Sequence, residues 1–387
     1  MTTIPKDDDV VGAVVPVQRG ALLRPRARHL IIAGFVVVAL VIPLFATSFV
    51  TFQLTEVLIY GLAILGLNLL TGFNGQFSLG HSAFYGIGAY TAAIMIHNYE
   101  LSYIWTIPAA GGVCFVIGFL FGLPALRLQN LYLALATFAL ATAMPQILKF
   151  HALEAWTGGV QGLVVDQPEV PTSLLLGPFV GAACVLLPGG LFTVAIQMFV
   201  RFGIKDVLSL SVPVSLPMSD DQWLYYFTLI VVLVMFACAA SLIHSRTGRA
   251  IMAIRDNPIA AAAMGINNSL YKTLTFGVSA LYTGIAGALG ALAIGFVAPD
   301  SFTIFLSISL LVGLVIGGVG SIPGCLFGGL FVLYVPNIAN ALSTGLAGAI
   351  YGVILLLVIF VMPAGAAGFV RVAAARLSRR QPQSEGR

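Results

Sequence analysis

The polar side chains best suited to chemistry stand in one glycine-rich stretch between Thr71 and His81. Gln76, Ser78 and His81 offer an amide, a hydroxyl and an imidazole there. Such groups can replace the water around a small polar solute, but they do not pair a nucleophile with its general base. Hydrogen-bonded helix packing is the alternative role for His81. The four cysteines stand singly, so no zinc or redox spacing is present.

The elements that position these residues follow from composition. Of 387 residues, 59% are hydrophobic and 8% are charged, whereas roughly a quarter of an ordinary soluble domain is charged. A bilayer core is ~30 Å thick, so a spanning helix needs ~20 mostly apolar residues. Such stretches recur along most of the chain. We therefore predict an all-α, polytopic bundle of transmembrane helices.

Hydropathy predicts about ten spans. The first apolar stretch is longer than the ~7 to 15 residues of a cleaved signal's hydrophobic region, so it counts as a span. The predicted spans are His29–Phe49, Leu54–Leu70, Phe77–Ile96, Ile104–Pro124, Leu131–Leu148, Trp223–Ile243, Thr273–Ile294, Ile304–Gly318, Gly324–Leu342 and Ala347–Met362.

Basic residues predict which side of the membrane each loop occupies. Most of the 18 lysines and arginines fall in the tails 1–28 and 364–387, in the loop 244–272, or at Arg127. Ten spans place all of these on one side, and positively charged loops stay in the cytoplasm. Both termini and the loop 244–272 are therefore expected to be cytoplasmic, flanking a transmembrane domain of residues 29–363.

The external segment 149–222 departs from this simple pattern. Leu174–Val200 is apolar but is interrupted by Gly177-Pro178 and by Pro188-Gly189-Gly190. One extra span there would move the loop 244–272 outside, so we expect an even number of crossings. A re-entrant or interfacial hairpin fits, because irregular backbone at membrane depth is tolerated where protein covers it.

Ionisable residues are rare inside the predicted spans, which argues against a proton pump or a membrane enzyme. Glu56 lies about one turn inside the second span. An interfacial carboxylate that reaches towards the headgroups is the simplest interpretation.

Small residues recur at helical spacing instead. Ser78, Ser82 and Gly86 follow one another every fourth residue, a pattern that lets helix backbones pack closely. Two stretches are denser in small residues than packing requires, and we call them the first glycine cluster (residues 71–81) and the second glycine cluster (residues 317–324). Interrupted apolar segments in both halves of a chain are typical of a transporter's substrate region.

The loop 244–272 is predicted to contain a short helix. Asp256 or Asn257 suits its N-cap, Pro258 its first position and Gly265 its end. Such a helix between two spans can act as a lever, although its arginines could instead serve only to fix topology. No lysine follows a glycine, so the chain has no phosphate-binding loop for ATP.

At these positions the sequence resembles the branched-chain amino acid ABC permease family, and in particular its LivM-type subunit. The resemblance covers most of Leu54–Pro363, although the segment from about Pro171 to Gln222 is longer than in that family. It rests on Leu67–Leu70 running into Gly75–Tyr90, on Thr157-Gly158-Gly159 with Gly162-Leu163, on Ser245–Ile266, and on Gly317–Gly324.

The resemblance implies a bacterial inner-membrane subunit that works with a second homologous permease, two cytoplasmic ABC ATPases and an extracytoplasmic solute-binding protein. ATP and Mg would bind the ATPases, so no cofactor is expected in this chain. Asn68 and Tyr85 join Gln76, Ser78 and His81 as pathway candidates. The loop that docks on an ATPase in that family corresponds to the coupling candidates Arg246, Gly248, Arg249, Arg255, Asp256, Asn257 and Gly265.

The resemblance does not single out one solute. Branched-chain amino acids are the commonest cargo, but similar permeases carry urea, short amides or other amino acids. A stand-alone secondary transporter or channel is the rival hypothesis. It would need its own coupling-ion site or selectivity ring, and the lack of buried carboxylates in the predicted spans argues against it.

Overall fold

The computed structural model describes residue 34, residues 37–125, 130–168, 219–343 and 345–362, and residues 365, 366 and 368. The predicted N-terminal tail, Arg127, the Leu174–Val200 hairpin and nearly all of the C-terminal tail lie outside these residues. Within them the chain is mainly helical, which confirms the all-α membrane class.

The helices and strands follow one another along the chain, and residues 37–45, before the first of them, are also helical. β1 and β2 pair antiparallel, with Leu163 opposite Val297. The elements are α2 (Ser48–Asn68), the π-helix η2 (Leu69–Phe73), α3 (His81–Tyr99), α4 (Tyr103–Ala125), α5 (Asn130–Leu148), η3 (His151–Leu153), α6 (Glu154–Thr157), β1 (Leu163–Val164), α9 (Asp220–His244), α10 (Arg246–Asp256), α11 (Pro258–Ala263), α12 (Asn268–Ile294), β2 (Phe296–Val297), η4 (Pro299–Phe302), α13 (Ile304–Gly317), α14 (Gly324–Leu342) and α15 (Ala347–Val361).

Each predicted span from the second onward overlaps one of these helices, but three helices start four to six residues away from the predicted position. α2 begins at Ser48 and α12 at Asn268, so Lys272 lies on a helix and not in the loop. α3 begins only at His81, because Gly75 adopts a positive φ of 74° and the chain from there to Gly80 is not helical. Hydropathy averaged over a span-length window does not locate such a break to the residue.

Length and hydropathy together single out the helices that can cross a bilayer alone. Five stretches are long and apolar enough to cross a bilayer alone: Ser48–Phe73, Tyr103–Pro124, Asp220–His244, Asn268–Ile294 and Gly324–Leu342. Tyr132–Leu148 makes a sixth when combined with His151–Thr157, from which it is bent by 64°. Ile304–Gly317 and Gly348–Val358 are shorter apolar helices. The total of ten spans stays a prediction.

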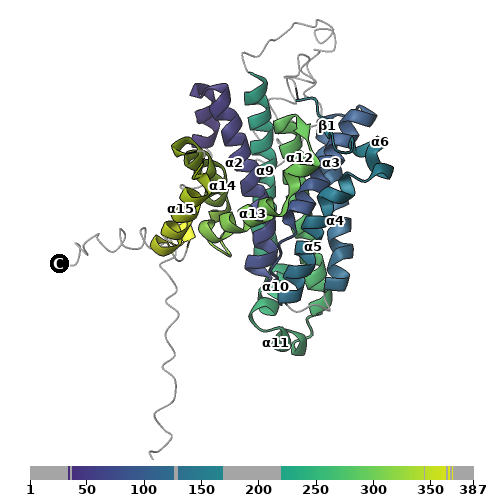
Figure 1. Cartoon of the computed structure of the whole chain (residues 1–387). Coiled ribbons are helices and arrows are strands. Elements are labelled where there is room, and N and C mark those ends of the chain that lie inside the picture. The colour runs from purple at the N-terminus through teal and green to yellow at the C-terminus, as the bar shows by residue number, and fades with distance from the viewer. Residues whose placement is uncertain are drawn as a thin grey trace, which may run out of the picture.

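Helix α12 lies at the centre of the bundle and packs against α2, α3 and α4 (Figure 1). α9 and α14 pack on other sides of α2, and α15 packs on α14. Figure 1 shows α10 and α11 at one end of the bundle and β1 with α6 at the opposite end. Most of the large side chains that are fully buried, including Leu62, Leu65, Phe276 and Leu289, come from α2 and α12.

Backbones approach one another closely where glycines face each other. A Cβ atom added to Gly88 of α3 would overlap the carbonyl oxygen of Gly284 on α12. α13 and α14 pack in the same way through Gly317 against Gly324. Glycines are needed at these contacts, because lipid provides no hydrophobic drive and close packing must join the helices.

We predict that Gly88→Ala destabilises the protein by about 1–3 kcal/mol, the usual cost of overpacking. The midpoint of thermal unfolding in detergent should fall. Gly112→Ala on α4 is the matched control, because no atom lies within 4 Å of the added methyl group. Its midpoint should be unchanged or slightly higher, since alanine favours helix. Equal midpoints for the two variants would contradict this account of α3–α12 packing.

Candidate functional site

The two glycine clusters, far apart in sequence, are joined by Asn68. Its side chain is fully buried at the end of α2. Its Nδ2 donates to the carbonyl oxygen of Ser321 at 3.0 Å, and its Oδ1 accepts from the backbone N–H of Gly320 at 2.8 Å. The backbone N–H can only donate, which fixes the orientation of the amide. We call these three residues the Asn68 clasp.

Gly72 lies directly beside the Asn68 clasp. A Cβ atom at Gly72 would overlap Asn68 Oδ1 and lie 2.7 Å from the Gly320 nitrogen. Gly72 belongs to the π-helix η2, and π-helical turns are frequent at functional sites. Only glycine therefore fits at the point where α2 ends and the first glycine cluster meets the second.

Arg255 connects α10 to this same point. Its Nη1 donates to the carbonyl oxygen of Gly72 at 3.0 Å. Its Cγ atom would lie 2.9 Å from a Cβ atom on Gly75, so the aliphatic part of the side chain rests on the glycine backbone. Asp256 orients the guanidinium by accepting from Nε and Nη2 at 2.9 and 2.8 Å. This exposed ion pair adds little stability, but it sets direction.

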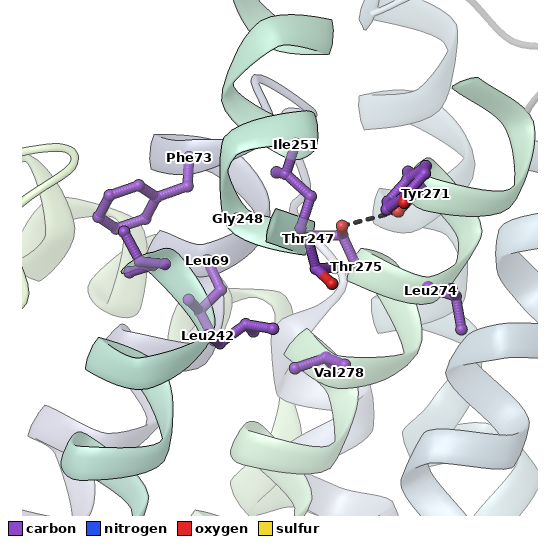
Figure 2. A pocket seen from close by; sticks show the side chains of 11 residues that line it. Leu69, Phe73, Leu242, Thr247, Gly248, Ile251, Tyr271, Leu274, Thr275 and Val278 are labelled. Atoms are coloured by element: carbon purple, nitrogen blue, oxygen red, sulfur yellow. Dashed lines mark hydrogen bonds between the residues drawn. The ribbon is translucent and has the colours of Figure 1, made fainter. Parts of the chain in front are cut away.

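An apolar cavity of about 40 Å³ lies where α10 meets the bundle (Figure 2). Its walls come from η2, the end of α9, the start of α10 and the first turns of α12. Among its lining residues are Leu69, Phe73, Leu242, Gly248, Ile251 and Val278. The cavity lies on the α10 face that carries Gly248 and Ile251, so α10 is incompletely packed against the spans there.

The predicted short helix is α11, and its predicted cap is confirmed. Asn257 Oδ1 accepts from the N–H groups of Ile259 and Ala260, both at 3.0 Å, and Pro258 takes the first position. Asp256, the other cap candidate, instead ends α10. Gly265 adopts a φ of 82° directly after Met264, the C-cap of α11.

Sequence reasoning missed α10 itself and the exposed apolar side chains of Ile259 and Met264, which we call the tip of α11. Ser245 caps α10 by accepting from Gly248 N–H at 3.2 Å, an N-cap signal that the sequence does contain. The Ile259 and Met264 side chains are 83% and 85% exposed. Arg246 and Arg249 are exposed on α10 at the same end of the bundle.

His81 is bonded through both ring nitrogens. Ser279 donates its hydroxyl proton to the Gly66 carbonyl at 2.6 Å, so it must accept from His81 Nε2 at 2.8 Å. Nδ1 then accepts from the Ser78 hydroxyl at 3.2 Å. The side chain is 1% exposed, and this neutral, fully bonded arrangement favours the packing alternative for His81.

The other pathway candidates are buried as well. Gln76 Oε1 accepts from Asn74 Nδ2 at 2.9 Å within the non-helical segment. Tyr85 places its hydroxyl against the backbone of Gly290 on α12. The structure brings Asn68, Gln76, Ser78 and His81 together around the first glycine cluster, whereas their contact with a solute stays a prediction.

Glu56 is not the interfacial carboxylate that the sequence predicts. It is 8% exposed, so it is buried within the bundle. The direction of a side chain depends on which neighbouring helices cover it, and hydropathy alone does not report that. No group of three or more His, Cys, Asp or Glu residues able to hold a metal ion occurs among the residues that the structure describes.

Fold and site together define a polytopic α-helical membrane protein in which a loop of two short helices contacts the interrupted part of the bundle. The family described as "Branched-chain amino acid transport system / permease component" matches residues 49–361. The chain belongs to this family of permease components.

Individual relatives agree. The chain is 35% identical over 268 residues to the high-affinity branched-chain amino acid transport system permease protein LivM of Salmonella typhimurium, covering 69% of this chain and 58% of the relative. LivM of Escherichia coli is 34% identical with the same coverage. LivH of Salmonella typhimurium is 25% identical over 318 residues, 80% of this chain and 91% of the relative. This chain thus matches somewhat more than half the length of the LivM relatives. No solved structure matches it.

We predict that Ile251→Ala enlarges the cavity beneath α10 and lowers the free energy of unfolding by about 2–4 kcal/mol. Ile259→Ala removes the same atoms from an exposed position and should change it by no more than about 0.5 kcal/mol. Thermal unfolding of both variants in detergent measures the difference. If Ile251→Ala proved as stable as Ile259→Ala, α10 would not be packed on the bundle as described.

Proposed function

We propose that this chain is a permease subunit of an ABC importer and forms half of a translocation pathway for branched-chain amino acids. The contact between Arg255 and the Gly72 carbonyl carries this proposal, because it links the α10–α11 loop to the interrupted part of the bundle. Family membership supports the substrate class. A permease of the same family for urea, short amides or other amino acids is the alternative.

The pathway forms between this chain and a second homologous permease. Similarity to both LivM and LivH of one organism supports a pair of related subunits. Ten spans place both termini and the α10–α11 end in the cytoplasm, where the basic residues of that end belong. Two cytoplasmic ATPases bind ATP and Mg, and an extracytoplasmic protein delivers the solute.

The α10–α11 loop docks on an ATPase through the tip of α11. Ile259 and Met264 expose large apolar side chains outside the spans, and such side chains gain free energy when a partner covers them. Arg246 and Arg249 are exposed on the first turn of α10 and add positive charge to the same loop. Asn257 and Gly265 define the ends of α11 and so hold the tip in place.

Movement of the docked loop reaches the membrane through Arg255. ATP-driven closure of the ATPases displaces α10, and Arg255 passes the displacement to Gly72 and Gly75. The segment from Gly75 to Gly80 is not helical, so it can rearrange without breaking a helix. Gln76 and Ser78 lie in this segment and become the solute contacts when it opens, while His81 and Tyr85 border it.

We predict that Ile259→Ala weakens association with the ATPases about tenfold. Burial of an isoleucine side chain is worth about 1.5–3 kcal/mol, and 1.4 kcal/mol corresponds to a factor of ten. Co-purification of the complex and ATP-dependent uptake by proteoliposomes are the measurements. Ile294→Ala is the matched control and should behave as wild type. Ile294 is 53% exposed and lies at the end of α12 that is remote from α11. Similar losses in both variants would argue against docking at α11.

Reconstitution tests the class of transporter. Uptake of radiolabelled leucine into proteoliposomes should require the second permease, the ATPases, ATP and the binding protein together. Excess urea or acetamide should not compete. Uptake by the purified chain alone would contradict the ABC assignment and favour a stand-alone transporter or channel.

A further inference from the structure

Three contacts in succession join α10 to the turn between α13 and α14. Arg255 donates to the Gly72 carbonyl, and Gly72 packs on the Asn68 side chain with no room for a Cβ atom. Asn68 in turn bonds the backbone of Gly320 and Ser321. The α10–α11 loop is therefore linked to the second glycine cluster through Gly72 and Asn68. The residues named here make no direct contact between the two.

The Asn68 amide uses both its oxygen and its nitrogen to bond the turn between α13 and α14 and the start of α14. Its oxygen accepts from Gly320, and its nitrogen donates both to Ser321 O and, at 3.3 Å, to Cys325 Sγ. The side chain is 0% exposed, so each broken bond would leave a buried polar group unpaired. Asn68 therefore has no donor or acceptor directed towards open space, as a solute contact requires.

The turn bonded by Asn68 moves with two helices. A Cβ atom on Gly317 would overlap the Gly324 carbonyl, and one on Gly328 would overlap the Gly313 carbonyl. Backbones packed this closely cannot slide past one another without clashing. A displacement applied to the turn thus reaches α13 and α14 together as a hairpin.

We propose that Asn68 is a positioning residue for coupling, which passes the displacement of α10 from η2 to the α13–α14 hairpin. The two halves of the subunit then move as one. This inference rests on the proposed function, because it requires that α10 be displaced by a partner ATPase. It replaces a solute-contact role for Asn68 with a mechanical one.

The first test uses the complete transport complex in proteoliposomes. In Asn68→Ala, ATP hydrolysis stimulated by the loaded binding protein should continue, while solute imported per ATP should fall about tenfold or more. The solute concentration for half-maximal uptake should stay the same. Asn98→Ala, exposed at the end of α3, is the control and should keep the wild-type ratio. Unchanged import per ATP in Asn68→Ala, or a raised half-maximal concentration with normal import per ATP, would overturn the proposal.

The second test does not depend on a variant at Asn68. Spin labels at Val319→Cys, 55% exposed, and at Thr142→Cys, exposed on α5, report movement of the turn. A label at Ala262→Cys, paired with Thr142→Cys, reports movement of α11. Both distances should change at the same ATP concentration in a complex whose only other change is Cys238→Ser, which removes an exposed native thiol. A change at Ala262 without one at Val319 would overturn the inference.

The outcomes separate the two levels of the argument. An otherwise wild-type complex that shows no ATP-driven uptake refutes the proposed function itself. If the otherwise wild-type complex transports normally and the Asn68→Ala complex still shows the Val319 movement, only the role of Asn68 is refuted.

Discussion

Close contact between helix backbones is the constraint on which this structure depends. Apolar side chains gain little by leaving lipid for protein, so the helices must be joined by dispersion contacts and internal hydrogen bonds. Helix α12 meets this requirement by presenting glycines to its neighbours. Gly284 faces Gly88 of α3 and Cys114 of α4, and Gly287 faces the backbone at Tyr85. The central position of α12 follows from this face.

Polar side chains form hydrogen bonds between the packed helices. Ser279 of α12 bonds the backbone of α2 at Gly66 and accepts from His81 of α3, so one hydroxyl connects three helices. The Ser307 hydroxyl accepts from the N–H of Ser82 and bonds its hydroxyl, which connects α13 to α3. These bonds are made inside the bundle, where an unpaired polar group would be costly. Polar residues in the spans therefore specify which helices pair and in what register.

The α10–α11 loop combines a firm contact with a loose one. Arg255 is bonded to the Gly72 carbonyl, whereas the α10 face that carries Gly248 and Ile251 borders an apolar cavity. Gly248 itself lies directly against the carbonyl oxygens at the end of α9. The cavity leaves room beside Ile251, while the Arg255 bond and the Gly248 contact hold α10 to the bundle. This arrangement suits an element that must transmit movement into spans whose own packing is tight.

The sequence by itself determined the helical membrane class, the approximate spans, the family motifs and the two cap candidates of α11. These depend on local patterns: runs of apolar residues, the spacing of glycines, and Asn257 directly before Pro258. Only the tertiary structure decided that Asn68 bonds a turn 252 residues away and that His81 bonds Ser279. It alone placed Arg255 on Gly72 and buried Glu56. The physical reason is that a buried side chain takes its direction and partners from helices distant in sequence, and composition carries no record of which helix that is.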